Sequence, residues 1–292
     1  MSHRLAGFPR RVMWTRGEGC AELATAIGPA VQVEGDLRSA VIKGRADLLV
    51  ARKLTSFDLV GVAVPHGFSA PEVAGVVAAV GGGPHSALAA VVAGRLAASL
   101  GVTGSIASAS ASSEDDAAAE GLLAEVGSLV PEMPAKVVRA ASARHLVDGL
   151  PHGSLLVVGA PGGSWMQRQF FGPGRQLVVR ASAGAVVVRS APARCFHAME
   201  EASPFGPAMP VAEARRLLID SSAPVVDAGV LVGIVRRSAL IDSAGGTVGD
   251  VSEDPVFVSD ADPLEAAADL LGFIDPVPVV DSSGRLKGVV RG

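Results

Sequence analysis

Glycines gather at two points of this sequence where a phosphate group could be bound. Gly81, Gly82 and Gly83 directly follow an apolar run that ends at Val80. A second set follows the apolar residues 155–158 with the spacing Gly-x2-Gly-x9-Gly, and it consists of Gly159, Gly162, Gly163 and Gly172. Because glycine lacks a Cβ, its backbone N–H groups can approach an anion closely. Glycines at such positions permit either the close approach of an anion or tight turns of the backbone.

The residues beside the second set leave two interpretations open. Arg175 can supply positive charge to a phosphate, as guanidinium groups commonly do. Pro173, however, directly follows Gly172 and brings neither a hydroxyl nor a backbone N–H donor. The glycines therefore form either a nucleotide-phosphate site or a set of tight turns without a ligand.

Other chemistries find little support in the residue pattern. No Gly-Lys-(Ser/Thr) sequence follows Gly83, so a Walker A loop is excluded. The histidines show no metal-ligand spacing, and Cys20 and Cys195 lie far apart without a Cys-x-x-Cys motif. No set of base, nucleophile and oxyanion donors is visible. We therefore expect neither a metal site nor catalytic residues.

Strands alternate with helices over the first two thirds of the chain. Apolar runs predict strands at residues 11–15, 30–33, 47–51, 59–64, 73–80, 102–109, 136–140, 154–158 and 185–189. Helices are expected at 20–27, 37–43, 84–100, 112–130 and 142–149. This alternation predicts an α/β fold with a parallel sheet, in which ligands bind beyond the carboxyl ends of the strands.

One pattern occurs twice in the last third of the chain. Each copy has a helix, a Pro-Val-Val-Asp strand and a strand that contains Gly-(Ile/Val)-Val. The helices are expected at 211–218 and 263–271, and the strands at 223–227, 231–235, 277–281 and 286–290. Such a repeat indicates two similar α+β units that pack together.

This repeat resembles the CBS domain pair, also called a Bateman module, over about residues 196–292. The resemblance implies an adenine nucleotide, AMP or ATP, in the clefts between the copies. Val225, Arg236 and Val279 are the candidate cleft residues. Arg236 stands where the family usually has a hydroxyl, and Ala239 stands at the position of the ribose-binding Asp. A pair that only packs and dimerises is therefore the alternative.

The glycine-rich region, residues 72–191, resembles the universal stress protein domain, a Rossmann-like fold. The first strand with its glycine turn and the later Gly-x2-Gly-x9-Gly element carry this resemblance. It implies that ATP, with Mg²⁺ only as the nucleotide complex, contacts a defined set of residues. That set is Val80, Gly81, Gly82, Gly159, Gly162, Gly163, Gly172 and Arg175. Residues 1–70 form an additional α/β segment of unknown role.

Composition excludes two classes of partner. The net charge is −4, aromatic residues make up 4%, and there is no Tyr, so we expect no nucleic-acid binding. The longest uncharged run, residues 73–94, contains three glycines and a proline, which predicts a strand, a turn and a helix rather than a membrane span. Two distant cysteines and the lack of a signal-peptide pattern predict a cytoplasmic protein.

The sequence thus predicts a stress-protein-like domain at 72–191 and a CBS-like pair at 195–292, with copies at about 196–242 and 247–292. The expected function is non-catalytic regulation through the sensing of adenine nucleotides, with an unknown regulatory partner protein. The alternatives are a dimerisation scaffold with degenerate nucleotide sites and a nucleotide-hydrolysing or adenylyl-transfer enzyme. The apolar strand 185–189 is expected at a sheet edge, where it would pair with a second copy to form a homodimer.

Overall fold

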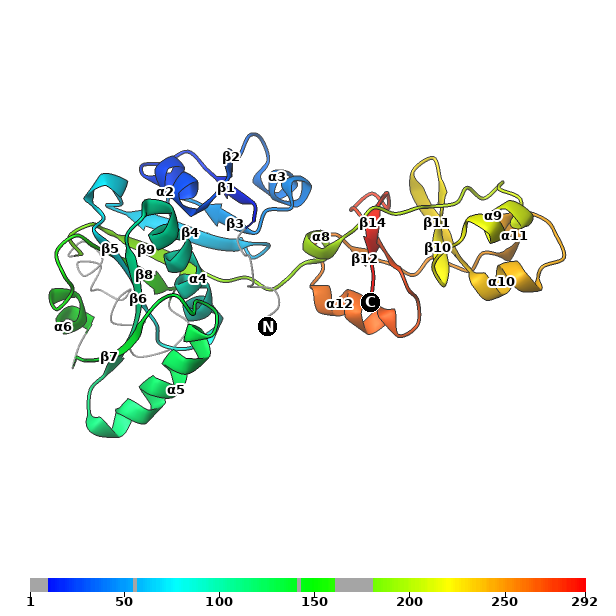
Figure 1. The fold of residues 1–292 in the computed structure, drawn as a ribbon. Coiled ribbons are helices and arrows are strands. Elements are labelled where there is room, and N and C mark those ends of the chain that lie inside the picture. The colour runs from blue at the N-terminus through cyan, green and yellow to red at the C-terminus, as the bar shows by residue number, and fades with distance from the viewer. Residues whose placement is uncertain (1–9, 55–56, 141–142, 161–180) are drawn as a thin grey trace. The chain divides into compact units, whose positions relative to one another are not determined.

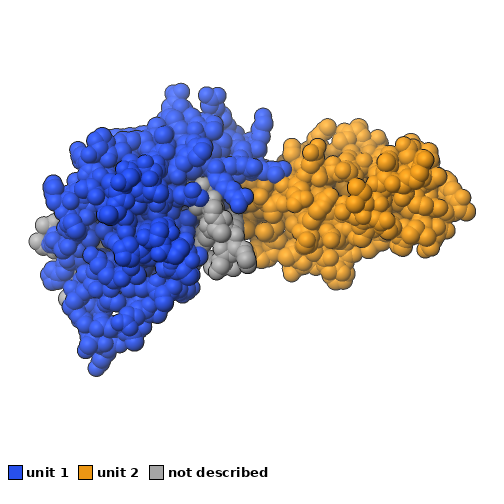
Figure 2. Space-filling view, in the orientation of Figure 1, with its two compact units in different colours: residues 1–191 blue, residues 192–292 orange. Residues whose placement is uncertain are grey.

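The computed structural model describes residues 10–54, 57–140, 143–160 and 181–292. The chain forms two compact units, Met1–Ala191 and Pro192–Gly292, which Figure 2 distinguishes by colour. Figure 1 shows a large sheet with helices in unit 1 and two small sheets with short helices in unit 2. No described helix has the length and apolar character needed to cross a membrane.

Unit 1 is built around one nine-stranded sheet. Its strands are β1 (Val12–Trp14), β2 (Ala30–Gln32), β3 (Leu48–Val50), β4 (Gly61–His66), β5 (Gly75–Ala79), β6 (Thr103–Ser110), β7 (Ala135–Arg139), β8 (Ser154–Gly159) and β9 (Ala185–Arg189). Its helices are α2 (Cys20–Ile27), α3 (Leu37–Gly44), α4 (Gly83–Leu100), α5 (Asp116–Gly127) and α6 (Ala143–Asp148), with 3-10 turns at Ala70–Glu72 and Ser113–Asp115. The α/β parallel-sheet prediction is therefore confirmed for this unit.

The strand order is β2-β1-β3-β4-β9-β8-β5-β6-β7. Every neighbouring pair is parallel except β4 and β9, which are antiparallel. The prediction that strand 185–189 lies at a sheet edge is wrong, because β9 has β8 on one side and β4 on the other. Strands from residues 1–70 thus belong to the same sheet as the strands that follow them.

The main core of unit 1 lies between the sheet and the helices α2, α4 and α5. Helix α4 is the centre of this layer and contacts β5, β6, β8 and β9. It ends at Leu100, and the left-handed backbone of the following Gly101 (φ 67°) lets the Gly101 N–H donate to the Ala97 carbonyl. Helices α2 and α4 also pack directly against each other. The sheet and α4 together therefore fix the loops at the carboxyl ends of β5 and β8.

Unit 2 contains the predicted repeat. Its strands are β10 (Ser222–Asp227), β11 (Val230–Arg236), β12 (Val258–Ser259), β13 (Val277–Val280) and β14 (Leu286–Val290). Its helices are α8 (Cys195–Ala198), α9 (Val211–Leu217), α10 (Arg237–Asp242), α11 (Val248–Val251) and α12 (Leu264–Leu271). The antiparallel pairs β10–β11 and β13–β14 have matching irregularities after Val225 and Val279. Each copy has an apolar core, and Ile234 of β11 contributes to the core of the second copy.

Candidate functional site

The glycine turn of unit 1 lies at the carboxyl edge of the parallel strands. The chain leaves β5 through Gly81 and Gly82 and enters α4. This helix leads to β6, which lies on one side of β5. On the other side of β5 lies β8, which ends at Gly159. The space between β5 and β8 is thus a topological switch point, where open α/β sheets bind ligands. The structure brings Val80, Gly81, Gly82 and Gly159 to this point.

Close packing explains two of these glycines. A Cβ at Gly159 would come within 2.8 Å of the His85 backbone, so β8 and the start of α4 approach each other too closely for a side chain. Gly82 has a φ of 93°, which favours glycine, and a Cβ there would meet nothing within 4 Å. The turn therefore leaves open space beside Gly82 at the carboxyl edge of the sheet.

Two side chains at the start of α4 fix the ends of neighbouring strands. The buried Ser86 hydroxyl accepts a hydrogen bond from the Gly81 N–H (3.1 Å), so that donor is already satisfied within the protein. Nδ1 of His85 accepts a hydrogen bond from the Ser190 N–H (3.1 Å), just beyond β9. Burial lowers the pKa of His85, and the charge of Arg189 lowers it further.

The remaining predicted residues of this nucleotide site lie outside the described part of the chain. They are Gly162, Gly163, Gly172 and Arg175. The described residues thus supply the first half of the expected site, from β5 and β8.

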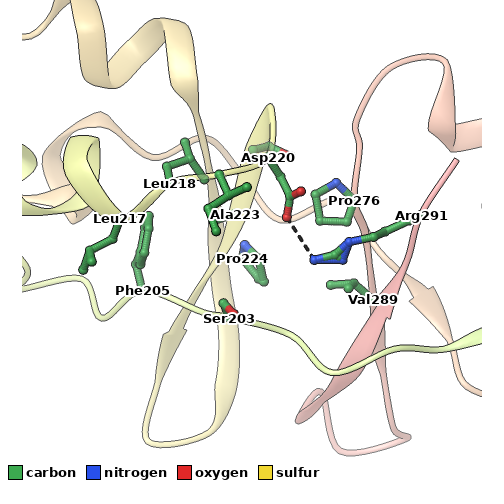
Figure 3. Close-up of a pocket in the computed structure, with 12 residues that line it drawn as sticks. Ser203, Phe205, Leu217, Leu218, Asp220, Ala223, Pro224, Pro276, Val289 and Arg291 are labelled. Carbon is green, nitrogen blue, oxygen red and sulfur yellow. Dashed lines mark hydrogen bonds and ion pairs between the residues drawn. The ribbon is translucent and has the colours of Figure 1, made fainter.

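A cavity of about 310 Å³ in unit 2 is a candidate ligand site. Figure 3 shows its lining residues, which come from both copies of the repeat. The apolar walls are Phe205, Leu217, Leu218, Ile219, Ala223, Pro224, Pro276 and Val289. The polar groups are Ser203, Asp220, Ser222 and Arg291. Cavities of this size with apolar walls and a few polar groups are typical of small-molecule sites.

Asp220 and Arg291 face each other in this cavity (Figure 3). Asp220 follows α9, and Arg291 follows β14, so each copy contributes one of the charges. Nη2 of Arg291 lies 3.0 Å from Oδ2 of Asp220, and Nη1 lies 3.6 Å from Glu200 Oε2. Both Asp220 and Arg291 keep about a third of their side-chain surface exposed, at 37% and 33%. The pair can therefore exchange partners with a ligand.

The connection that carries Asp220 is held by a second arginine. The Arg237 guanidinium donates hydrogen bonds to the carbonyl oxygens of Leu218, Ile219 and Asp220. Backbone carbonyls between α9 and β10 would otherwise lack partners, because the helix has ended. Arg237 thus positions the backbone of Asp220, whose carboxylate lines the cavity.

Arg236, one of the predicted cleft residues, lines a second cavity of about 430 Å³. This cavity shares Ile219, Asp220 and Ser222 with the first one. Nε of Arg236 lies 3.0 Å from the Glu253 carboxylate, and Nη1 donates to the Phe273 carbonyl (2.9 Å). The two adjoining cavities therefore place a paired arginine at each side of Asp220.

Val225 and Val279 occupy different positions from Arg236. Each is fully buried in the core of its own copy, and neither is among the residues that line the two cavities. Their neighbour Pro224 lines the first cavity instead. Asp220 was not predicted as a site residue. The sequence offered one signal for it: Asp220 is an acidic residue close to the start of a strand that is repeated in the second copy.

The described residues form no metal site, and both cysteines are buried. No group of three or more His, Cys, Asp or Glu side chains among them is placed to hold a metal ion. Cys20 and Cys195 are both buried. Burial raises the pKa of both thiols, to about 11 for Cys195.

Comparison with known proteins identifies the class of unit 2. The CBS domain family model matches residues 204–246 and 248–291, so unit 2 contains a pair of CBS domains, as predicted. A CBS domain-containing protein from Thermotoga maritima is 22% identical and covers 34% of this chain and 84% of its own, with a TM-score of 0.30. A CbpB structure in complex with c-di-AMP is 13% identical and covers 34% and 79%, with a TM-score of 0.30.

Universal stress protein structures are also among the matches. One in complex with cAMP is 23% identical and covers 40% of this chain and 97% of its own, with a TM-score of 0.33. Both families expected from the sequence thus occur in the comparisons. A search of the curated proteins found no match.

Proposed function

We propose that this protein is a non-catalytic regulatory protein that senses an adenine nucleotide in the CBS pair of unit 2. The observation that carries the proposal is the 310 Å³ cavity with apolar walls and the Asp220–Arg291 pair at its side. Apolar walls suit a nucleobase, and a carboxylate and a guanidinium suit a ribose and a phosphate. Arg236, in the adjoining cavity, extends the positive charge available to a phosphate chain.

Each ligand group has a corresponding residue in the proposal. Phe205 and Pro224 lie on the apolar side of the cavity and would contact the base (Figure 3). The Asp220 carboxylate would accept hydrogen bonds from the ribose hydroxyls. Arg291 would donate to a phosphate oxygen, in place of one of its bonds to a carboxylate. Ligand binding would therefore change the ion pair that links the two CBS copies.

Calorimetry and thermal shift with ATP, ADP, AMP, cAMP and c-di-AMP test the proposal. The last two are the ligands named for two similar structures. A ligand that binds only the folded protein raises its melting temperature. Arg291→Ala should lower affinity for a phosphate-bearing ligand about 10- to 100-fold, because it removes one charge-assisted hydrogen bond of roughly 1.5–3 kcal/mol.

Lys287→Ala is the matched control for Arg291→Ala. Lys287 is an exposed cation of β14, the strand that Arg291 follows, and it does not line the cavity. Its removal should leave affinity unchanged. If no nucleotide produces heat or raises the melting temperature at millimolar concentration, the sensing proposal is wrong and the scaffold alternative holds. If both substitutions weaken binding equally, the cavity is not the site.

The glycine turn of unit 1 is a second candidate for ATP. The observation in its favour is the position of Gly81, Gly82 and Gly159 at the switch point between β5 and β8. ATP binding there, with Mg²⁺ as its complex, would not depend on Arg291. An ATP signal that survives in Arg291→Ala therefore supports this candidate.

The non-catalytic part of the proposal has its own test. The protein should hydrolyse ATP only in trace amounts when Mg²⁺ is present. A turnover near the roughly 10 s⁻¹ that is typical of enzymes would refute it and would favour the nucleotide-hydrolysing alternative.

The proposal also includes a homodimer or a regulatory partner protein, and a place in the cytoplasm in a stress response. Since β9 is paired on both sides, a binding surface has to lie elsewhere. Unit 2 exposes Leu217, Ile241 and Phe273 by 53%, 58% and 75%. Exposed apolar groups of this kind support a protein-binding surface. Ile241→Asp should then shift the mass measured by light scattering to that of a monomer.

A further inference from the structure

The antiparallel junction between β4 and β9 divides the sheet of unit 1 into two similar halves. From the junction outward, one half has the order β4-β3-β1-β2 and the other has β9-β8-β5-β6-β7. Within each half, the junction strand (β4 or β9) comes last in the chain. Next to it lies the strand that precedes it in the chain (β3 or β8). The first strand of the half (β1 or β5) and then the second (β2 or β6) lie farther out. Among the described strands, only β7 has no counterpart in the first half.

The residue registers of the two halves also agree. The triplet Leu-Leu-Val occurs in β3 as Leu48–Val50 and in β8 as residues 155–157. Leu48 pairs with Val12 in β1, and Leu155 pairs with Val76 in β5. After these first strands, Gly17 and Gly19 match Gly81 and Gly83, and α2 begins directly after Gly19 while α4 begins at Gly83. The first half is thus an abbreviated repeat of the second.

This equivalence places the junction strands in a symmetric register. Leu48 pairs with Gly61. In the second half Leu156 pairs with Ala185, so the preceding residue, Leu155, lies opposite Gly184. Three residues beyond these glycines lie Val64 and Val187, which are therefore equivalent. Val64 and Val187 are also directly paired with each other in the antiparallel ladder. Equivalent residues that face each other mark a twofold axis, as in an isologous dimer interface.

The junction is an extensive buried contact. Val62, Ala63 and Val64 in β4 are at most 1% exposed, and Val187 in β9 is 2% exposed. Across the same axis, α2 packs against α4, and both helices contribute to one core. Without β4 and α2, the second half would expose an apolar strand edge beside an apolar helix face. Such an edge pairs readily with another chain.

We propose that the surface formed by β9 and α4 is an interface that fits a second copy of itself, and that residues 11–66 occupy it within the same chain. The segment acts as a built-in, abbreviated second copy. It satisfies the β9 backbone groups, covers α4 and so prevents two chains from joining through this edge. This assigns residues 11–66 a role that does not depend on any nucleotide. If the segment is displaced, two β9 strands should pair with Val187 opposite Val187.

The test displaces β4 in the full chain and reports pairing through one cysteine. Cys20 and Cys195 are first replaced by Ala, so that only the introduced thiol reacts. Val62→Asp with Val64→Asp places two carboxylates in the buried junction, which should detach β4. With Val187→Cys added, oxidation should join two chains by a disulfide, because directly opposed residues lie within bonding reach. A non-reducing gel detects this product and ignores dimers formed elsewhere.

Val186→Cys is the matched control. In the twofold register, residue 186 of one chain lies opposite residue 188 of the other, so its thiol should not form the disulfide. With β4 intact, Val187→Cys should also remain unlinked, because Val64 lies opposite it. In that intact background, Val64→Cys with Val187→Cys should close a disulfide within one chain.

A milder variant keeps the test decisive if the two carboxylates prevent folding. Val62→Ala with Val64→Ala weakens the junction without adding charge. At high protein concentration it should still give the Val187 disulfide, more slowly than the aspartate variant. A folded alanine or aspartate variant that gives no intermolecular disulfide overturns the proposal. Equal cross-linking by Val186→Cys and Val187→Cys also overturns it, because the pairing would then lack the twofold register.

Discussion

Arg291 and Asp220 join the two CBS copies of unit 2 through an ion pair of 3.0 Å. Arg236 is the counterpart of Arg291, since each follows the Gly-(Ile/Val)-Val strand of its copy. Each arginine also contacts a glutamate from the segment that leads into a copy, Glu253 for Arg236 and Glu200 for Arg291. Among the ion pairs that the structure gives for the described residues, Arg236 has no carboxylate that corresponds to Asp220. The two copies thus differ, since only Arg291 has the Asp220 carboxylate beside it in the cavity.

Asp220→Asn tests the assignment of Asp220 to the ribose. An amide oxygen accepts ribose hydroxyls less strongly than a carboxylate, so affinity for the bound nucleotide should fall about tenfold or more. The 2′,3′-dideoxy form of the same nucleotide has no hydroxyls to offer, and its affinity should hardly change. Calorimetry on both ligands measures the difference. The protein's own stability should change by less than about 1 kcal/mol, because the ion pair is partly exposed.

Glu200→Gln is the control for that prediction. Glu200 contacts the same arginine at 3.6 Å but does not line the cavity. Its replacement should leave the ratio between ribose and dideoxyribose affinities unchanged. An Asp220→Asn variant that loses both ligands equally would show that Asp220 acts only through Arg291.

Arg237→Ala should loosen the connection between α9 and β10. Three backbone carbonyl oxygens, of Leu218, Ile219 and Asp220, lose their donor in this variant. Because Arg237 is exposed, water replaces part of what is lost, and we expect a destabilisation of about 1–2 kcal/mol. Arg216→Ala is the control, since the exposed Arg216 on α9 makes no such bonds in the structure. Urea unfolding compares the two, and equal effects would contradict the positioning role of Arg237.

Most elements of the fold follow from short-range patterns. Helix Cys20–Ile27 and strand Ala185–Arg189 have the predicted bounds, because their apolar periodicity and flanking glycines are local signals. The neighbours of β9 could not be predicted in the same way. A run of valines shows that a strand is buried, but the identity of its partner depends on pairing across more than a hundred residues with Gly61–His66.

The candidate site was predictable only in part for a similar reason. Arg236 was found because it follows a strand that is repeated, which is a pattern within a few residues. Asp220 meets Arg291 from 71 residues away, and no spacing rule relates the two. Helices α10 and α11 were not predicted, since each has six residues or fewer and too few turns for a periodic pattern.

Gly184→Ala should be among the most destabilising small substitutions in unit 1. Gly184 has a φ of 83°, and a Cβ there would lie in steric overlap with the Gly67 backbone beside β4. Left-handed strain costs about 1–2 kcal/mol, and the clash adds to it, so we expect a loss of about 2–4 kcal/mol. Gly101→Ala is the control, because Gly101 has a similar φ of 67° but open space around a Cβ. If thermal unfolding shows equal losses, the close approach of Gly184 to Gly67 contributes nothing.

His85 should make the stability of unit 1 depend on pH. Burial and the nearby charge of Arg189 lower the pKa of His85 below its ordinary value of about 6.5. The folded state thus favours the neutral imidazole, whose Nδ1 accepts the Ser190 N–H. At a pH below that ordinary value the unfolded chain binds a proton that the folded chain resists, so the stability present at higher pH is lost as the pH falls. One such proton changes stability by at most about 1.4 kcal/mol per pH unit.

Urea unfolding between pH 8 and pH 5 measures this dependence. His85→Gln keeps a hydrogen-bond acceptor but cannot be protonated, so its stability should fall less steeply below about pH 6.5 than that of the wild type. The carboxylates of unit 1 affect both proteins alike and cancel in the comparison. His152→Gln removes an exposed histidine from the same unit and controls for the substitution itself. Parallel pH profiles for the wild type and His85→Gln would show that burial and the charge of Arg189 do not make the protonation of His85 costly for the folded state.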